Sequence, residues 1–215
     1  MRQRISTWGC LLGLAGLLGG CATAPQRYYS LAAPAGLEPV AASASPVSAD
    51  GLRLSVMRIP PEAERPQLVV RDPARDPAVQ VLNDSLWSAP LGDQIREVLA
   101  AEVSRRLGMP DAQQLPDAAG RPVRRIEVRI DRFDMVWGRF VALDAGWTDR
   151  APGTDRPRLC RASVRVPVTG DVAALVEAQR QALLRLGALV SQASAAGASK
   201  TDLQSGTVVS ESGCT

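Results

Sequence analysis

The feature that most constrains the fold is a long run of alternating residues near the middle of the chain. Ile126, Val128 and Ile130 alternate with charged residues, and this period of two predicts a β-strand with one buried face. From Phe133 onward the apolar residues occupy the other parity, which predicts a β-bulge near Asp131. Shorter runs of the same kind predict further strands at residues 52–59, 65–71, 78–82, 141–147 and 159–168.

Two segments follow the helical period instead. Residues 91–107 and 172–190 carry apolar side chains spaced by three and four positions, which places these side chains on one face of a helix. The predicted order of elements is therefore β-β-β-α-β-β-β-α. Runs of strands with two long helices predict a single α+β domain, in which both helices cover a mostly antiparallel or mixed sheet. Apolar residues on both faces of 52–59 predict a central strand there.

The start of the chain has the pattern of an export signal. Arg2 and Arg4 precede an apolar run at residues 11–18, which is too short to span a membrane. Leu18, two glycines and Cys21 form the pattern of a bacterial lipobox, which predicts cleavage before Cys21 and acylation of its thiol. An ordinary signal peptide with a chance cysteine is the alternative. Ala22 stands where an aspartate would resemble an inner-membrane retention signal, so the outer membrane is favoured.

Composition divides the chain into four parts. We predict a signal peptide at 1–20, a lipid anchor and tether at 21–50, an α+β domain at 51–190 and a flexible tail at 191–215. The tether is rich in Ala, Pro and Ser, yet it contains Tyr28 and Tyr29, the chain's 2 tyrosines. These rings either pack on the domain as an added strand or lie among lipid headgroups.

Catalysis and nucleic-acid binding are disfavoured by composition. The chain has 0 histidines, so it lacks a Ser-His-Asp arrangement and the commonest metal ligand, and we predict no metal and no cofactor. The formal charge of +3 falls to 3 − 2 = +1 when Arg2 and Arg4 leave with the signal, which offers little attraction for nucleic acid. Asp131 and Asp134, with Glu127 nearby, form a carboxylate cluster, but its neighbouring arginines favour a solvated surface over a catalytic pair.

Two cysteines are left for the folded domain. Cys160 and Cys214 would lie in an oxidising compartment after export, where a disulfide can persist. A bridge between them closes a loop that stabilises the fold by about 4 kcal/mol in the chain-entropy model. Two free thiols are the alternative.

Three segments together resemble a known family. Residues 28–31 after the lipidated cysteine, residues 65–71 and residues 83–91 are similar, in this order and spacing, to the ABC-type transport auxiliary lipoproteins, the PqiC-like family. Phe133, Gly138 and Trp147 also fit the second half of the family, so the resemblance covers residues 21 to about 190. Ala89 departs from the pattern, because an acidic residue often precedes Pro-Leu at this place in the family.

The resemblance implies a non-catalytic transport subunit, lipid-anchored at the outer membrane and facing the periplasm. Its expected partners are a mammalian-cell-entry (MCE) domain protein and the associated membrane transporter subunits, with lipid as cargo and assembly into a homo-oligomeric ring. The residues that it assigns to partner binding are Tyr28, Tyr29, Arg65, Gln67, Arg71, Trp87, Pro90 and Leu91. Two rival hypotheses are a structural or assembly lipoprotein without a transporter, and a periplasmic hydrolase that uses Asp131 and Asp134.

Overall fold

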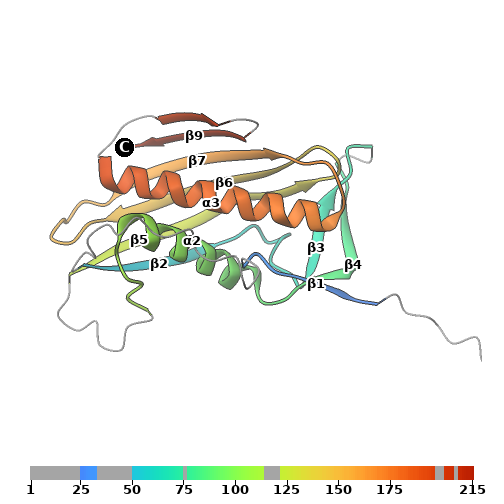
Figure 1. Ribbon diagram of the computed structural model, residues 1–215, viewed down its shortest axis with the longest axis horizontal. Helices are drawn as coiled ribbons and strands as arrows, with labels where there is room; N and C mark the ends of the chain where they lie inside the picture. The colour runs from blue at the N-terminus through green and yellow to red at the C-terminus, as the bar shows by residue number, and fades with distance from the viewer. Residues whose placement is uncertain (1–24, 33–49, 75–76, 114–121, 197–200, 206–207) are drawn as a thin grey trace, which may run out of the picture.

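The computed structural model describes residues 25–32, 50–74, 77–113, 122–196, 201–205 and 208–215 (Figure 1). These residues contain one mixed sheet of 9 strands and two helices. The strands are β1 (Arg27–Tyr29), β2 (Gly51–Arg58), β3 (Gln67–Arg71), β4 (Val79–Trp87), β5 (Val123–Val136), β6 (Phe140–Arg150), β7 (Arg158–Pro167), β8 (Thr201–Ser205) and β9 (Val208–Cys214). The helices are α2 (Leu91–Leu107) and α3 (Val172–Ala196).

The sheet is mixed because it contains both parallel and antiparallel pairs of neighbouring strands. Its strand order is β1-β4-β3-β5-β6-β7-β9-β8, and β2 pairs with β5 next to β3. The pairs β5–β6, β6–β7 and β7–β9 are antiparallel, whereas β1–β4, β2–β5 and β3–β5 are parallel. Both helices lie on the same face of the sheet (Figure 1). The predicted α+β architecture, with two helices on a mixed sheet, is therefore confirmed.

Strand β5 carries the predicted bulge. Its pairing with β6 shifts register between Ile130 and Arg132, so Asp131 is the additional residue. Before the bulge Ile126, Val128 and Ile130 are buried, and after it Phe133 and Met135 are buried. One extra residue thus keeps the apolar residues of both halves on the side of the helices.

The two helices close the core over this face. The buried residues of α2 include Leu91, Ile95, Leu99 and Val103, which follow the helical period. Gly108 ends the helix with φ 63°, a left-handed conformation that glycine adopts without steric cost. Among the described helices, none has both the length and the apolar character needed to cross a bilayer.

Two sequence predictions about the strands need correction or extension. Strand β2 was expected to be central, but it pairs with β5 on one side, and among the described strands none pairs with its other side. Its solvent-side residues include the exposed Arg53 and Met57, because an antiparallel or mixed sheet can leave one face in water. Strand β1 lies inside the predicted tether and pairs in parallel with β4, so the expectation of an added strand at the tyrosines is confirmed.

The predicted flexible tail from Ser191 also differs from the structure. Helix α3 continues to Ala196, and β9 pairs with β7 and β8. A composition rich in Ser, Ala and Gly is typical of fraying ends. Here Ser194 is buried and hydrogen-bonded, and β9 satisfies the free edge of β7, so tertiary contacts outweigh local propensity.

Candidate partner-binding site

Most of the residues assigned to partner binding lie where β1, β3, β4 and α2 meet. The backbone N–H of Trp87 donates to the carbonyl of Pro66 (2.7 Å), and the N–H of Ser88 donates to the carbonyl of Tyr29 (2.8 Å). These two bonds join segments that are far apart in the sequence. The end of β4 is therefore held from both sides, immediately before the helix begins.

The helix start follows from local chemistry. Ala89 precedes Pro90, and a residue before proline is biased toward extended backbone, so β4 does not run directly into helix. Pro90 is the N-cap residue, with φ −50° and ψ 129°, and its carbonyl accepts from the N–H groups of Asp93 and Gln94. Ser88 does not supply a side-chain cap. Leu91 is then the first helical residue and is buried.

An open groove lies at this junction, with a volume of about 500 Å³. We call it the tryptophan groove. Its lining residues are Ile59, Glu64, Arg65, Pro66, Trp87, Ala89, Pro90, Leu91, Gly92 and Asp93. Trp87, Leu91 and Ile59 contribute apolar surface that belongs to the core, whereas Glu64, Arg65 and Asp93 are exposed at the rim. An apolar floor with a polar rim is the usual anatomy of a protein-binding surface.

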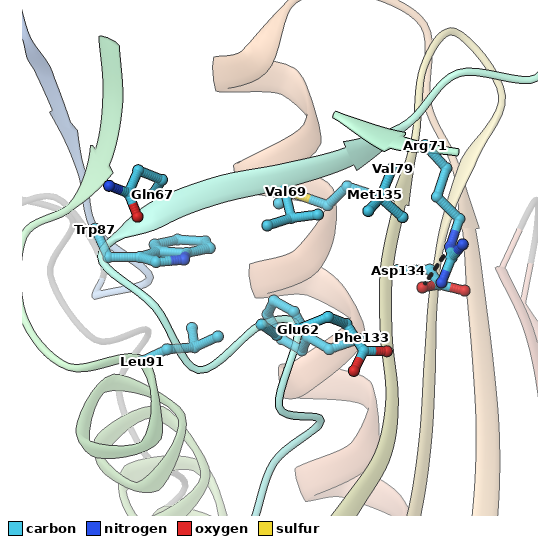
Figure 2. Close-up of a pocket in the computed structure, with 11 residues that line it drawn as sticks. Glu62, Gln67, Val69, Arg71, Val79, Trp87, Leu91, Phe133, Asp134 and Met135 are labelled. Atoms are coloured by element: carbon cyan, nitrogen blue, oxygen red, sulfur yellow. Dashed lines mark hydrogen bonds and ion pairs between the residues drawn. The ribbon is translucent and has the colours of Figure 1, made fainter. Parts of the chain in front are cut away.

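Trp87 is the central residue of this site. Its ring is 6% exposed and meets Phe133 edge-to-face, with the ring centroids 6.3 Å apart. Trp87 and Phe133 both line a narrow crevice of about 20 Å³ that also contacts Val69 and Met135 (Figure 2). The crevice holds no more than about one water molecule, so the larger tryptophan groove is the surface that a partner can enter.

The N-terminal segment is fastened to the helix by a residue that the sequence analysis missed. The N–H of Leu31 donates to Oε1 of Gln94 (2.9 Å), and Nε2 of Gln94 donates to the carbonyl of Ala89 (2.8 Å). Gln94 is 5% exposed and Leu31 is 0% exposed. A polar residue on the apolar stripe of α2, between Leu91 and Ile95, was the available signal.

The assigned residues do not all reach the groove. Arg65, Trp87, Pro90 and Leu91 line it. Gln67 lines the crevice instead. Arg71 lies at the other end of β3, where its Nε donates to Oδ1 of Asp134 at 3.0 Å (Figure 2).

The two tyrosines differ in exposure. Tyr29 is half-buried and packs on the core, whereas Tyr28 is 64% exposed and its hydroxyl contacts Gln26. Tyr28 is therefore free to contact a partner or a membrane surface, while Tyr29 mainly fixes β1. Cys21, the predicted lipidation site, lies outside the described residues.

The carboxylates proposed for a hydrolase are engaged in ion pairs. Asp131 pairs with Arg129 at 2.7 Å, and Asp134 pairs with Arg71 at 3.0 Å and with Arg132 at 3.4 Å. The crevice that Asp134 lines is too small for a substrate. Within the described ranges there is also no group of three or more carboxylate or cysteine residues placed to hold a metal ion.

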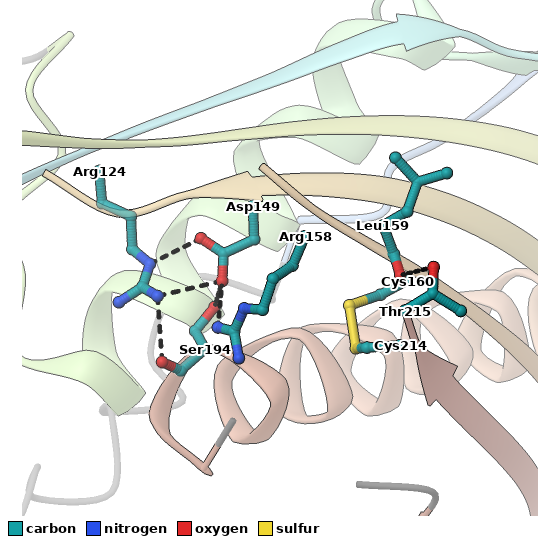
Figure 3. Close-up of a disulfide and its surroundings, with 8 residues drawn as sticks. All are labelled: Arg124, Asp149, Arg158, Leu159, Cys160, Ser194, Cys214 and Thr215. Carbon is teal, nitrogen blue, oxygen red and sulfur yellow. Dashed lines mark hydrogen bonds and ion pairs between the residues drawn. A yellow bond between two sulfur atoms is a disulfide. The ribbon is translucent and has the colours of Figure 1, made fainter. Parts of the chain in front are cut away.

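A buried ion cluster lies beside the C-terminal end of α3 (Figure 3). Asp149 is 2% exposed. It accepts from Nε of Arg124 (2.7 Å), Nη2 of Arg158 (2.9 Å) and the hydroxyl of Ser194 (2.9 Å). Burial alone raises the pKa of Asp149, but the hydrogen bond and charge of Arg124, with the bonds from Ser194 and Arg158, outweigh it, so this pKa lies below its ordinary value of 3.8.

The predicted disulfide is present in the structure. Cys160 of β7 and Cys214 of β9 are joined, with their Cα atoms 4.0 Å apart (Figure 3). Leu159 and Thr215 next to them exchange both backbone hydrogen bonds. The cysteines therefore occupy the neighbouring non-hydrogen-bonded pair, where antiparallel strands bring side chains closest together. The alternative of two free thiols is wrong for this structure.

Comparison with known proteins agrees with this architecture. Residues 29–191 match a family described as ABC-type transport auxiliary lipoprotein component. The crystal structure of an uncharacterised protein superposes with a TM-score of 0.56 at 18% identity, covering 78% of this chain and 97% of that chain. The crystal structure of a Xanthomonas campestris protein of the DUF330 family superposes with a TM-score of 0.51 at 18% identity, covering 66% of this chain and 82% of that chain. At this identity the two structures establish the fold alone. Among curated proteins, none matches this chain.

Proposed function

Because the chain belongs to the family of ABC-type transport auxiliary lipoprotein components, we propose that it serves an MCE-type lipid transport system as a non-catalytic subunit. In this role Cys21 carries an acyl anchor in the outer membrane, and the domain faces the periplasm. The tryptophan groove binds the MCE-domain protein or one of its membrane transporter subunits. The family resemblance adds a ring of identical copies, which native mass spectrometry of the extracted protein tests.

The observation that carries this proposal is the convergence of separate family segments on one groove. Residues around Arg65 and residues 87–91 come from different parts of the chain, and both line the same hollow of about 500 Å³. Strand β1, which contains Tyr28 and Tyr29 of the third segment, is paired with the edge of β4 beside the groove. A surface assembled from distant segments with an apolar floor supports binding of a partner.

The role of the anchor follows from the position of β1. Tyr29 is paired with Trp87 in the sheet, so β1, the strand that follows Cys21 in the sequence, lies next to the groove. An acyl group on Cys21 would hold this side of the domain within a short tether of the membrane. The groove would then face a partner that approaches the same membrane.

The test is a pull-down of the membrane-extracted, full-length lipoprotein with mass spectrometry of its partners. The groove is blocked by Gly92→Phe, because Gly92 lines it and an added Cβ there meets nothing within 4 Å. Ala101→Phe is the matched control, since Ala101 is exposed on the same helix and does not line the groove. We expect the wild type and Ala101→Phe to recover an MCE protein and permease, and Gly92→Phe to recover them at least tenfold less.

Two other results would overturn parts of the proposal. Recovery of other envelope proteins without transporter subunits would favour a structural or assembly lipoprotein. Equal recovery of transporter subunits by Gly92→Phe and Ala101→Phe would show that the partner binds elsewhere than the groove. Cys21→Ser serves as the unanchored control, and we expect it to lose recovery from the outer-membrane fraction.

A further inference from the structure

Three arginines stand side by side on the face of the sheet opposite the helices. Arg53 of β2 is directly paired with Arg125 of β5, and Arg125 is directly paired with Arg150 of β6. Directly opposed residues on neighbouring strands project from the same face. All three side chains are exposed. We call this set the arginine row.

The arginine row differs from the other charges on this face. Farther along β5, Arg129 is paired with Asp131 at 2.7 Å, and Arg132 is paired with Asp144 at 3.5 Å. By contrast, none of the three row arginines forms an ion pair with a carboxylate in the described part of the chain. Like charges placed directly opposite each other destabilise a sheet. The three guanidinium groups are therefore available to a negative charge supplied from outside the chain.

The row also forms one side of a hollow. This hollow has a volume of about 770 Å³, and the β6–β7 connection at residues 151–155 lines its other side. Asp155 is the acidic residue of the lining, so the lining charges sum to 3 − 1 = +2. The connection is held in a turn, in which the N–H and hydroxyl of Thr154 both donate to the carbonyl of Ala151 (3.3 and 2.7 Å). The hollow therefore has the arginine row on one side and a hydrogen-bonded turn on the other.

The donor set fits a phosphate group. Each guanidinium offers five N–H donors in a planar fork, and arginine binds phosphate oxygens in pairs. Strands lie about 4.8 Å apart, so the outer two Cα atoms of the row are roughly 10 Å apart, and long side chains can converge on one group between them. A carboxylate has two oxygens and is satisfied by one arginine. A phosphate has more acceptor oxygens and carries up to two charges, so it can engage all three.

We propose that the arginine row and the residue 151–155 turn form a binding site for a phosphate group, either a free phosphate compound or the headgroup of a phospholipid. The site is separate from the tryptophan groove. The β6–β7 connection lies at one end of the molecule, and β1 with β3 and β4 lies at the other (Figure 1). The proposal therefore does not depend on the partner surface.

The first experiment measures phosphate binding by calorimetry on the full chain with Cys21→Ser. The test variant is Arg53→Gln/Arg125→Gln/Arg150→Gln. The matched control is Arg58→Gln/Arg139→Gln/Arg161→Gln, which removes three exposed arginines elsewhere and changes the charge equally. We expect inorganic phosphate to bind the wild type and the control equally and the test variant at least tenfold more weakly. Equal weakening in both triple variants, or phosphate binding no tighter than acetate binding, would overturn the site.

The second experiment distinguishes the source of the phosphate. The same three proteins are floated with phosphatidylcholine vesicles, with and without phosphatidic acid. Flotation that requires phosphatidic acid and is lost in the test variant alone assigns the site to a lipid headgroup. Phosphate binding without such flotation assigns it to a soluble phosphate compound. Binding to neither phosphate nor the vesicles by the wild type would overturn the proposal, and thermal unfolding of each variant confirms that it is folded.

Discussion

Neighbouring residues in the sequence carry buried, paired charges on the face of the sheet that the helices cover and exposed, unpaired charges on the opposite face, which we call the open face. Arg124 and Asp149 point under the helices and form a buried pair, with 2.7 Å between Nε and Oδ1. Arg125 and Arg150 follow them directly, and they stand on the open face as an unpaired row. A buried charge without a partner is very costly, whereas water screens repulsion between exposed charges. Solvent access therefore decides where this fold tolerates like charges side by side.

The largest expected effect is the loss of the buried pair. Asp149→Asn leaves Arg124 buried without its counter-charge, and we expect the free energy of unfolding to fall by about 3–5 kcal/mol. Urea denaturation of the wild type and variant measures it. Asp131→Asn is the control, because its exposed pair with Arg129 should leave the midpoint unchanged. Similar midpoints for both variants would mean that the two faces do not differ as described.

The disulfide joins β7 to β9, and its loss should have the next largest effect. Replacing both Cys160 and Cys214 by Ala should lower the free energy of unfolding by about 2–4 kcal/mol, because the unfolded chain regains the freedom of a long loop. Thermal unfolding with and without reductant measures this. The reductant should destabilise the wild type and leave the double variant unchanged. A wild type that is insensitive to reductant would contradict a stabilising bridge.

Acid should weaken the covered face through the same aspartate. The pKa of Asp149 in the folded state lies below its ordinary value of 3.8. Its contribution to stability is therefore complete above that value and is lost as the pH falls through the folded-state pKa, with a slope of at most about 1.4 kcal/mol per pH unit. The difference in free energy of unfolding between the wild type and Asp149→Asn should shrink below about pH 4. A constant difference down to pH 2 would contradict this assignment.

The smallest effect concerns the open face. Arg125 has an arginine on each side, so Arg125→Gln should raise the free energy of unfolding by a few tenths of a kcal/mol at low salt. About 1 M salt should abolish the gain, since the Debye length is then near 3 Å. Chemical denaturation at both salt concentrations, without phosphate, is the measurement. Arg129→Gln is the control and should show no gain, because Arg129 is already paired. A loss of stability in Arg125→Gln would show that its repulsion is offset within the chain.

Periodicity predicted much of the fold because burial on one side leaves a direct trace in the sequence. The shift of parity between Ile130 and Phe133 located the bulge, and the stripes of α2 and α3 identified both helices. The same method misplaced β2 as central, since apolar Met57 is exposed on its outer side. It also misjudged the end of α3 and strand β9, where partners distant in sequence supply hydrogen bonds and strand pairing.

The candidate site was only partly predictable. Trp87, Pro90 and Leu91 stood out as a motif, and the structure places all three at the tryptophan groove. Gln94 was missed, because its importance lies in a hydrogen bond to Leu31 of a distant segment. The arginine row was also invisible, since it depends on the register of three strands.

The sequence by itself determined the fold class and the family of this protein, through its alternating strands, its two helical stripes and its family segments. These signals are local, because each depends on neighbouring residues and on one buried face. Only the tertiary structure decided which charges are paired, which segments line the groove and where β1 and β9 join the sheet. Such outcomes depend on strand order, register and helix placement, and contacts between residues far apart in the chain leave no periodic trace.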